Sequence, residues 1–260
     1  GSFDVTAGRV LAVGSTAGGS TNPLGTAPVV IDGGSLLLDS KVGGVAFDTA
    51  VVVATSGTVD AQTVAATTTL GSAANGVYLA AGQTLTLNAV GSQDTQATGA
   101  VLTLPGVVSG PGGLRVTQTV GGVSSGTVTL TGANTFTGAT TVVSGTLAAN
   151  STTALGNSAA DLVVGDPTGQ FPAALLFGTA FTTARNVVIA AVVPGSATVG
   201  SSAGVAVTFT GTVTSNVGAV FNAAGGSTVT FSGNLSLGLG GETVQGGGTV
   251  VYSPEVTLSR

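Results

Sequence analysis

Short runs in which apolar and polar residues alternate recur along the whole chain, and glycine interrupts them every few positions. Thr84-Leu-Thr-Leu87 and the run from Thr208 to Thr214 show the alternation most clearly. This period places the apolar side chains on one face of a strand and the polar ones on the other. Long stretches of helix-forming residues are missing, so nothing favours a helix. The pattern predicts an all-β protein.

The expected strands are separated by turn residues roughly every eight to twelve positions, which fits about three short strands per coil of a solenoid. They cover residues 5–13, 29–38, 51–55, 83–88, 100–104, 127–131, 162–165, 174–177, 187–192, 205–214, 227–232 and 249–252.

The order of these segments occurs twice. The run at 34–38 recurs at 173–177, the run at 51–54 recurs at 187–190, and the run at 82–87 recurs at 226–231, at offsets of about 140 residues. A sandwich has no reason to repeat one strand order without a linker. We therefore predict a single elongated β-solenoid over residues 1–260, built from two tandem super-repeats at approximately 1–125 and 126–260. Its coils should contain roughly 20 to 25 residues and stack at the ~4.8 Å strand spacing.

The composition changes what the surface can do. Charged residues make up 6% of the chain against about 25% in typical proteins, so Thr, Ser, Asn and Gly must form the wet surface. The net charge is −5, and the five cations are scattered along the chain, which argues against a nucleic-acid partner. These cations are Arg9, Lys41, Arg115, Arg185 and Arg260.

Several kinds of chemistry lack their residues. The chain has no Cys, Met, His or Trp, which removes disulfides, thiolate chemistry, the usual zinc sites and the commonest general base. We therefore expect no catalytic residue, no metal ligand and no cofactor. Gly, Ser or Thr interrupts every Val/Leu cluster, so no run approaches the roughly 18 apolar residues of a membrane span. No membrane insertion by this segment is expected.

One stretch carries a family resemblance. It runs from Leu130 through Gly132-Ala-Asn-Thr-Phe-Thr-Gly138 to Val142, and continues with Ser144-Gly-Thr-Leu147 and Ala154-Leu-Gly156. In the order of its turn glycines and Thr/Val strands it resembles the autotransporter-associated β-strand repeat of large secreted bacterial surface proteins. The likeness is fairly specific over about forty residues and weaker elsewhere.

The resemblance implies a right-handed parallel β-solenoid, which is the passenger region of these proteins. It also implies a location that is secreted or at the cell surface of a bacterium, of the Gram-negative type. No signal peptide precedes Gly1 and no translocator barrel is present. We therefore expect a mature or cut piece of a larger product, with the secretion route left open.

Parallel β-helices include carbohydrate-active enzymes, which use a pair of carboxyl groups on either side of the bond that they cleave. Asp32 and Asp39 could be brought together by a turn, as could Asp161 and Asp166. The expectation is that all four are hydrated loop or turn acids. A structural calcium ion at either loop is the alternative, although neither an EF-hand loop nor an Asp-rich glycine repeat is present.

Thr-x-Thr pairs, such as Thr127/Thr129 and Thr228/Thr230, invite an ice-binding interpretation. That activity needs the pairs stacked on one face at every coil, and their uneven spacing argues against it. Threonine is also a favoured outward residue of strands, which explains the pairs without any ligand.

The leading hypothesis is an extracellular structural protein, a shaft or fibre subunit that extends, links or protects. The alternative is an adhesin-type module that recognises a cell-surface or matrix glycan, or a protein, through projecting loops. A carbohydrate-active enzyme is less favoured, because no cluster of Arg or Lys could hold an acidic sugar.

The expected partner is a second copy of the chain, stacked head-to-tail. By alignment of the super-repeats, the C-terminal segment stops where the N-terminal one begins, inside the family motif, and neither end carries a polar capping element. We therefore expect an open filament in which the last coil of one copy is completed by residues 1–13 of the next. The alternative is that Gly1 and Arg260 are the limits of one repeat within a longer polypeptide. The interface residues would be Phe3, Val5, Val10 and Val13 at the N-terminal side and Val250, Tyr252, Val256 and Leu258 at the C-terminal side.

Overall fold

The computed structural model describes residues 1–14, 22–40, 44–63, 67–91, 99–118, 126–253 and 256–258. Within these ranges the regular elements are all strands, with no helix, and the paired strands run parallel. The chain forms two compact units, Gly1–Ala139 with Thr153–Ser158, and Thr140–Thr152 with Ala159–Arg260. The strands stack in successive coils of a parallel β-solenoid, which confirms the predicted fold class.

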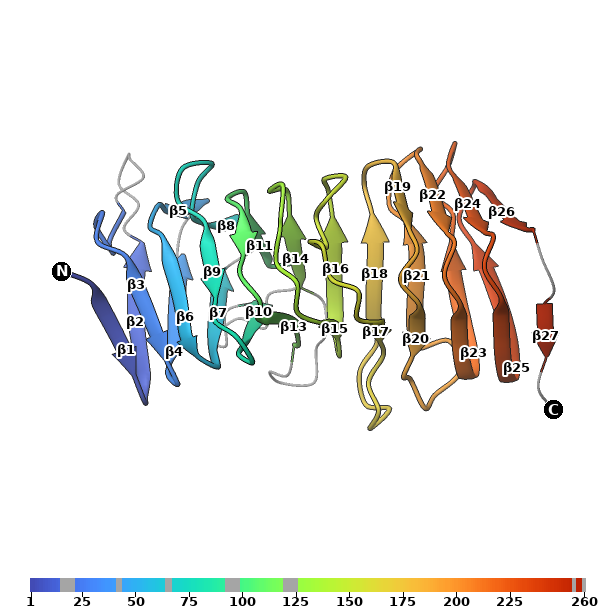
Figure 1. Cartoon of the computed structure of the whole chain (residues 1–260), viewed down its shortest axis with the longest axis horizontal. Coiled ribbons are helices and arrows are strands. Elements are labelled where there is room, and N and C mark those ends of the chain that lie inside the picture. The colour runs from blue at the N-terminus through green and yellow to red at the C-terminus, as the bar shows by residue number, and fades with distance from the viewer. Residues whose placement is uncertain are drawn as a thin grey trace. The chain divides into compact units, whose positions relative to one another are not determined.

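The first unit has three strand rows, visible side by side at the N-terminal part of the chain (Figure 1). From the second coil on, each coil of this unit contributes one strand to each row, and the first coil contributes β1 and β2 among the described residues. The first row consists of β1 (Phe3–Thr6), β3 (Val29–Asp32), β6 (Val51–Thr55), β9 (Val77–Leu79) and β12 (Val108–Ser109). The second consists of β2 (Arg9–Gly14), β4 (Ser35–Ser40), β7 (Gly57–Thr63), β10 (Thr84–Gly91) and β13 (Gly113–Val116). The third consists of β5 (Val45–Phe47), β8 (Thr67–Leu70), β11 (Val101–Leu104) and β14 (Thr127–Leu130).

The second unit repeats this arrangement, and two of its strands each span two rows. One row consists of β19 (Phe181–Thr183), β22 (Ala206–Phe209), β24 (Thr228–Phe231) and β26 (Thr249–Tyr252). The others contain β15 (Thr140–Val142), β17 (Leu162–Val164), β20 (Val187–Ile189) and β27 (Val256–Leu258), and β16 (Gly145–Ala149), β18 (Ala173–Phe177) and β21 (Ala197–Ser201). The long strands β23 (Val213–Asn222) and β25 (Leu235–Gln245) join both rows and pair with each other across a register shift near Val217.

Coil length varies more than the sequence pattern predicts. In the first row, Val29 pairs with Val51 and Val51 with Val77, whereas Val77 pairs with Val108, 31 residues further along. In the second unit Val229 pairs with Val250, only 21 residues away. The strands keep their register while the corners between them absorb the difference, because insertions in surface turns cost little.

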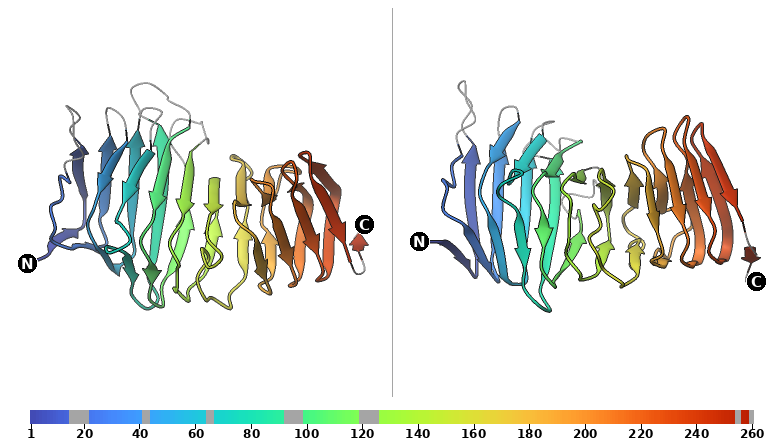
Figure 2. Two further views of the ribbon diagram at one scale, coloured as in Figure 1. Left: turned by 90° about the horizontal axis from the view of Figure 1, so that it is seen from above. Right: turned by 45° about the horizontal axis from the view of Figure 1, so that its top comes forward.

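Inward-facing side chains fill the interior of each coil. Val29, Ile31, Leu36, Leu38 and Phe47 are all fully buried. Burying a side chain of this size contributes about 1.5–3 kcal/mol, and the same two-residue alternation continues through both units. The parallel strand layers around this interior can be followed in both views of Figure 2. The core is therefore a stack of Val, Leu, Ile and Phe layers, one for each coil.

Polar side chains at the corners bind successive coils together. In the second unit, Asn186 donates from Nδ2 to Asp161 Oδ1 at 3.0 Å, and its Oδ1 accepts the Thr212 N–H at 3.0 Å. These three residues belong to three consecutive coils, because Leu162 pairs with Val187 and Val187 with Val213. One asparagine thus satisfies groups on both neighbouring coils, where a bare corner would leave them unpaired.

Three of the predicted strands are divided by a corner, and the one at 205–214 becomes β22 and the start of β23. The run at 5–13 forms β1 and β2, with Ala7 at φ 32° and Gly8 at φ 96° between them, and the run at 29–38 forms β3 and β4 around Gly33 at φ 83°. Backbone in this region suits glycine, so the glycines mark the corners inside what looks like one apolar run. The two predicted super-repeats and their limits near residue 125 stay a prediction.

In the part of the chain that the structure describes, no helix has the length and apolar character needed to cross a bilayer.

Candidate functional site

The corner from Thr131 to Gly138 lies in the stretch that carries the family resemblance, and Asn134 is its central residue. Asn134 is 1% exposed. Its Oδ1 accepts the Val108 N–H at 2.8 Å, and its Nδ2 donates to the Ala154 carbonyl at 2.6 Å. Val108 precedes the corner by one coil and Ala154 follows it, so a single buried amide connects three levels of the first unit.

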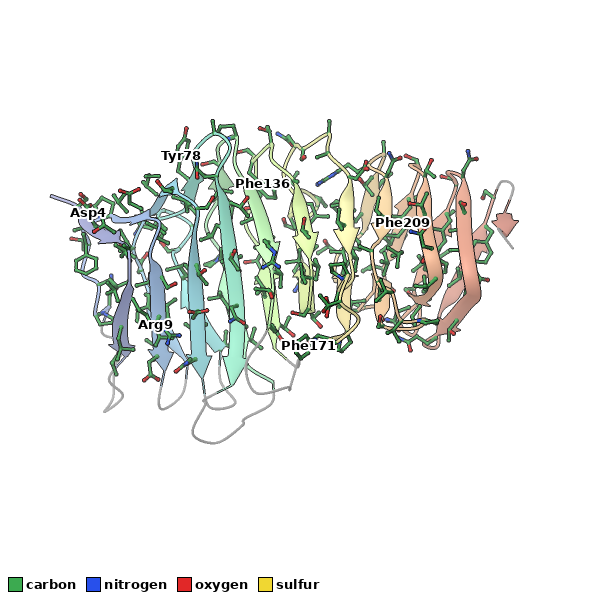
Figure 3. The ribbon with its side chains drawn as sticks, turned by 90° about the horizontal axis from the view of Figure 1, so that it is seen from below. Asp4, Arg9, Tyr78, Phe136, Phe171 and Phe209 are labelled. Carbon is green, nitrogen blue, oxygen red and sulfur yellow. The ribbon has the colours of Figure 1, made fainter. Side chains whose placement is uncertain are left out.

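The neighbouring residues of the motif also contribute to the stacking of successive coils. Phe136 is fully buried, and its carbonyl accepts the Asn157 N–H at 2.8 Å; Figure 3 labels this ring. A Cβ on Gly156 would lie 2.3 Å from that carbonyl, and one on Gly132 would lie 2.1 Å from the Gly106 carbonyl. Real Cβ atoms do not approach backbone this closely, so both glycines are required for the coils to stack. The motif is therefore a device for stacking coils.

The predicted N-terminal interface residues lie in β1 and β2. Phe3 is 43% exposed, whereas Val5 is already buried in the core of its own coil. In β2, Val10 is half-buried on the inner face and Val13 is 42% exposed on the outer one. Among the described residues β1 pairs with β3 and β2 with β4. Phe3, Val5 and Val10 therefore share the core side of an edge coil, and Val13 does not.

The predicted C-terminal interface residues lie in β26 and β27. Val250 and Tyr252 are half-buried and stand over Val229 and Phe231 of β24. Burial, together with the hydrogen bond that the Tyr252 hydroxyl donates to Glu242 Oε2 at 2.8 Å, raises the pKa of Tyr252. Val256 and Leu258 pair with Leu235 and Leu237 through the backbone, and their side chains lie outside the described part.

Tyr252 ends a row of aromatic rings in the second unit. Phe177 and Phe209 have centroids 5.8 Å apart, Phe209 and Phe231 5.2 Å, and Phe231 and Tyr252 5.7 Å, the last two pairs stacked. Offset or stacked aromatic pairs contribute about 0.5–1.5 kcal/mol beyond the area that they bury. Phe177, Phe209 and Phe231 are buried, so these three rings are part of the core.

The four candidate acids have different surroundings. Asp32 is exposed and accepts a hydrogen bond from the Thr55 hydroxyl, while Asp39 lies in β4. Asp161 is exposed and accepts from Asn186. Asp166 is the exception, because it is 3% exposed. Within the described ranges no group of three or more His, Cys, Asp or Glu side chains could hold a metal ion.

Asp166 organises its own loop. Its carboxylate accepts the Thr168 N–H at 2.8 Å, the Thr168 hydroxyl at 2.7 Å, the Gln170 N–H at 2.9 Å and the Phe171 N–H at 3.0 Å. Burial alone would raise the pKa of Asp166, but these four hydrogen bonds outweigh it and lower the pKa. Both carboxylate oxygens of Asp166 thus accept hydrogen bonds from its own loop and hold that loop in place.

A shallow hollow of about 300 Å³ opens on the outer side of the first row. Tyr78 stands at it with 47% of its side chain exposed, and Figure 3 shows this residue at the margin of the ribbon. The lining residues are uncharged: Ala50, Val51, Val52, Ala73, Ala74, Gly76, Val77, Tyr78, Val107 and Ser109. The sequence analysis did not select this site, although Tyr78 is the outward residue of an apolar strand, a signal for a surface aromatic.

Threonines do stack in register, although in short rows. Thr69, Thr103 and Thr129 occupy equivalent outward positions of β8, β11 and β14. The parallel column, Thr67 and Thr127, is interrupted by Val101. In the second unit Thr208 and Thr230 are in register with Val251. Neither array is a continuous two-column ladder, in agreement with the argument against ice binding.

No curated protein and no solved structure matches the chain significantly. Residues 124–149 match the family model described as passenger-associated-transport-repeat. This range covers β14, β15 and β16 together with the Asn134 corner, and it confirms the resemblance drawn from the motif. The matched repeat and the β-solenoid fold together fit an extracellular protein of the autotransporter passenger type.

Proposed function

We propose that this chain is a structural segment of a secreted bacterial surface protein, a β-solenoid shaft that extends, links or protects. The observation that carries the proposal is the Asn134 corner, whose conspicuous residues connect coil to coil instead of facing a ligand. The repeat family and the fold suggest a structural or adhesive protein. The location is a bacterial cell surface, of the Gram-negative type.

The shaft stacks head-to-tail with further copies of itself. The core sides of β1 and β26 have matching chemistry, because Phe3 and Val5 continue the layers of Val29 and Ile31, while Val250 and Tyr252 continue those of Val229 and Phe231. A copy that places its β1 beside β26 extends both the hydrogen-bond ladder and the aromatic row. Coils of the same polypeptide would make these contacts equally well, so the test uses the 260-residue chain itself.

Electron microscopy and sedimentation velocity of the purified chain test this assembly. Filaments that lengthen with protein concentration are expected, and deleting residues 1–8 or introducing Tyr252→Arg should shorten or abolish them. Tyr78→Ala is the matched control, since Tyr78 lies on the outer face of β9. A monomer at high concentration, or filaments that tolerate both changes, would refute the head-to-tail assembly.

The second candidate function is that of an adhesin, and the hollow beside Tyr78 is the observation that favours it. An exposed aromatic ring next to an uncharged recess suits the apolar face of a sugar ring. A glycan array with the isolated chain separates the two functions, because a pure shaft should show no saturable binding. Loss of binding in Tyr78→Ala would assign the binding to this hollow.

A carbohydrate-active enzyme has the least support. Asp32, Asp39 and Asp161 bind structural partners or lie along a strand, and the oxygens of Asp166 are taken by its own loop. Glycosidases need two carboxyl groups that flank one bond. Neutral polysaccharides should therefore remain intact after prolonged incubation with the chain.

A further inference from the structure

Asn75 and Gly76 form the one Asn-Gly dipeptide of the chain. This dipeptide is reactive for a physical reason. The backbone nitrogen after an asparagine can attack the side-chain carbonyl carbon, and glycine, which lacks a Cβ, leaves that approach open. Whether the reaction occurs in a folded protein depends on how the two residues are held.

The structure places the dipeptide at a corner between β8 and β9. Asn75 and Ser72 exchange backbone hydrogen bonds of 3.1 and 3.0 Å, which closes a turn. Both Asn75 and Gly76 are half-buried. The Gly76 carbonyl accepts the Val51 N–H at 3.0 Å, whereas the Gly76 N–H donates to none of the described residues. The attacking nitrogen is thus not engaged within this part of the chain.

The side-chain amide faces a carboxylate of the preceding coil. Asn75 Nδ2 donates to Asp48 Oδ1 at 2.8 Å, and the Asp48 carbonyl accepts Asn22 Nδ2 at 2.7 Å. The hydrogen bonds from Asn75 and, secondarily, Ser72 lower the pKa of Asp48, which keeps it ionised. Three successive coils therefore meet at Asp48, through its carboxylate on one side and its backbone carbonyl on the other.

We propose that Asn75 is a site of spontaneous deamidation that loosens this corner as the protein ages. The Gly76 nitrogen loses its proton and bonds to Asn75 Cγ, and the Cγ–Nδ2 bond breaks to release ammonia. Water then opens the cyclic imide at either carbonyl. The products are aspartate, or isoaspartate with the chain running through the side-chain carbon.

Both products disrupt the contact with Asp48. The donor at position 75 becomes a carboxylate opposite the Asp48 carboxylate, and like charges at hydrogen-bond distance repel. Isoaspartate also inserts a backbone atom before Gly76, whose carbonyl is bound by Val51. Ala73, Ala74 and Gly76 line the hollow beside Tyr78, so the change adds a negative charge to the rim of that hollow.

No other asparagine combines these features. Asn134 is buried with both amide atoms bonded, and the chain continues with Thr135. Asn157 is exposed, but Ser158, which follows it, has a side chain at Cβ and is buried. Asn75 should therefore convert before either of them.

Peptide mapping after incubation at mildly alkaline pH tests the proposal. A protease that does not require Lys or Arg is used, with fragmentation that distinguishes aspartate from isoaspartate. The expected result is that Asn75 acquires the mass increase of an amide-to-acid change first, with isoaspartate among the products. Conversion of Asn157 or Asn134 ahead of Asn75, or no conversion at Asn75 while the urea-unfolded chain converts there, would overturn it.

Substitutions separate the chemistry from its consequence. Asn75→Gln should remove the conversion, and Asn75→Asp should lower the melting temperature at neutral pH, less so near pH 4 where carboxylates begin to protonate. The exchanged pair Asp48→Asn with Asn75→Asp restores one amide opposite one carboxylate and should recover most of that loss. Asn157→Asp is the matched control, with little expected change. Equal melting temperatures for Asn75→Asp and the exchanged pair would refute the predicted repulsion.

Discussion

Asn134 shows how much of this fold depends on single buried polar groups. An unpaired backbone group costs about 1–3 kcal/mol when it is buried, and Asn134 pairs one N–H and one carbonyl on two different coils. No apolar residue of similar size can do both. The amide therefore acts as a strand pairing would, at a corner where the strands have ended.

Replacing this amide should be costly. Asn134→Ala leaves the Val108 N–H and the Ala154 carbonyl without their partner, and we expect a loss of about 3 kcal/mol in the free energy of unfolding. Urea denaturation measures it. Asn157→Ala, at an exposed position of the same unit, should change stability by less than about 0.5 kcal/mol. Equal losses in the free energy of unfolding for the two substitutions would show that the Asn134 hydrogen bonds do not stabilise the protein.

Thr68 contrasts with Asn134. Its side chain is fully buried in β8, and its Oγ1 makes no hydrogen bond with any of the described residues. Val45 and Leu102 occupy the equivalent inner positions of the adjacent coils. A hydroxyl at this inner position loses its hydrogen bonds to water, and no hydrogen bond to a described residue compensates for that loss.

Thr68→Val should therefore stabilise the protein. Valine has nearly the same shape and removes the unpaired hydroxyl, so a gain of about 1 kcal/mol is expected in thermal or urea unfolding. Thr69→Val, at the adjacent outward position, provides the comparison and should be close to neutral. A destabilised Thr68→Val variant would mean that the hydroxyl has a partner after all.

At the scale of elements, the loop after β17 depends on one ionised carboxylate. Asp166 must be charged to accept four hydrogen bonds, and its pKa is lowered accordingly. A carboxylate with a depressed pKa contributes stability that is present above its unfolded-state value of about 3.9 and is lost as the pH falls through the folded value.

The acid limb of the stability curve should therefore change when Asp166 is replaced. Asp166→Asn puts an NH₂ group in place of one acceptor oxygen, so the variant should be less stable at pH 7 and should lose less stability than the wild type between pH 5 and pH 2. Urea midpoints across this range measure the effect. Asp4→Asn, at an exposed site, should leave the pH profile unchanged; a parallel shift of the Asp166→Asn curve at all pH values would contradict the argument.

The elements also show what the sequence could and could not predict. Runs rich in β-branched residues predicted strands such as β6 and β26 at their observed bounds, because such residues favour extended strands. The corner at Ala7 and Gly8 was missed, because glycine also occurs inside strands of this chain, as Gly200 does in β21, and a single glycine does not by itself identify a corner. The predicted interface also mixes two faces, because Val13 lies on the outer side of β2 while Val10 faces inward.

The strand register was also beyond prediction from the sequence. Thr67 pairs with Val101 and Val101 with Thr127, at unequal separations of 34 and 26 residues, so stacked positions cannot be found from a fixed period. The burial of Asn134 could not be predicted either, because an asparagine that follows Gly132-Ala133 is typical of an ordinary turn. Its role depends on Val108 and Ala154, which belong to other coils.

At the scale of the whole molecule, charge contributes little and coil contacts contribute most. Among the described side chains there is one ion pair, Arg9 with Asp60 at 3.3 Å, and the Arg9 side chain is 52% exposed. Such pairs contribute about 0–1 kcal/mol. Stability must then come from each coil's contacts with the next, which is the nearest-neighbour situation of repeat proteins.

If each coil is stabilised mainly by its neighbours, a substitution in the core should destabilise only the adjacent coils. Phe209 is fully buried and touches Phe177 and Phe231 on the adjacent coils, so Phe209→Ala should cost about 3–5 kcal/mol through the cavity it leaves. Hydrogen exchange should show lost protection in β19, β22 and β24 of the second unit. The strands β3, β6 and β9 of the first unit have no contact with this cavity and should keep their protection. A matched Phe209→Leu variant should lose less protection in the same strands, because it leaves a smaller void. Uniform loss of protection across both units would mean that the chain unfolds as one cooperative body, and the nearest-neighbour account would then be wrong.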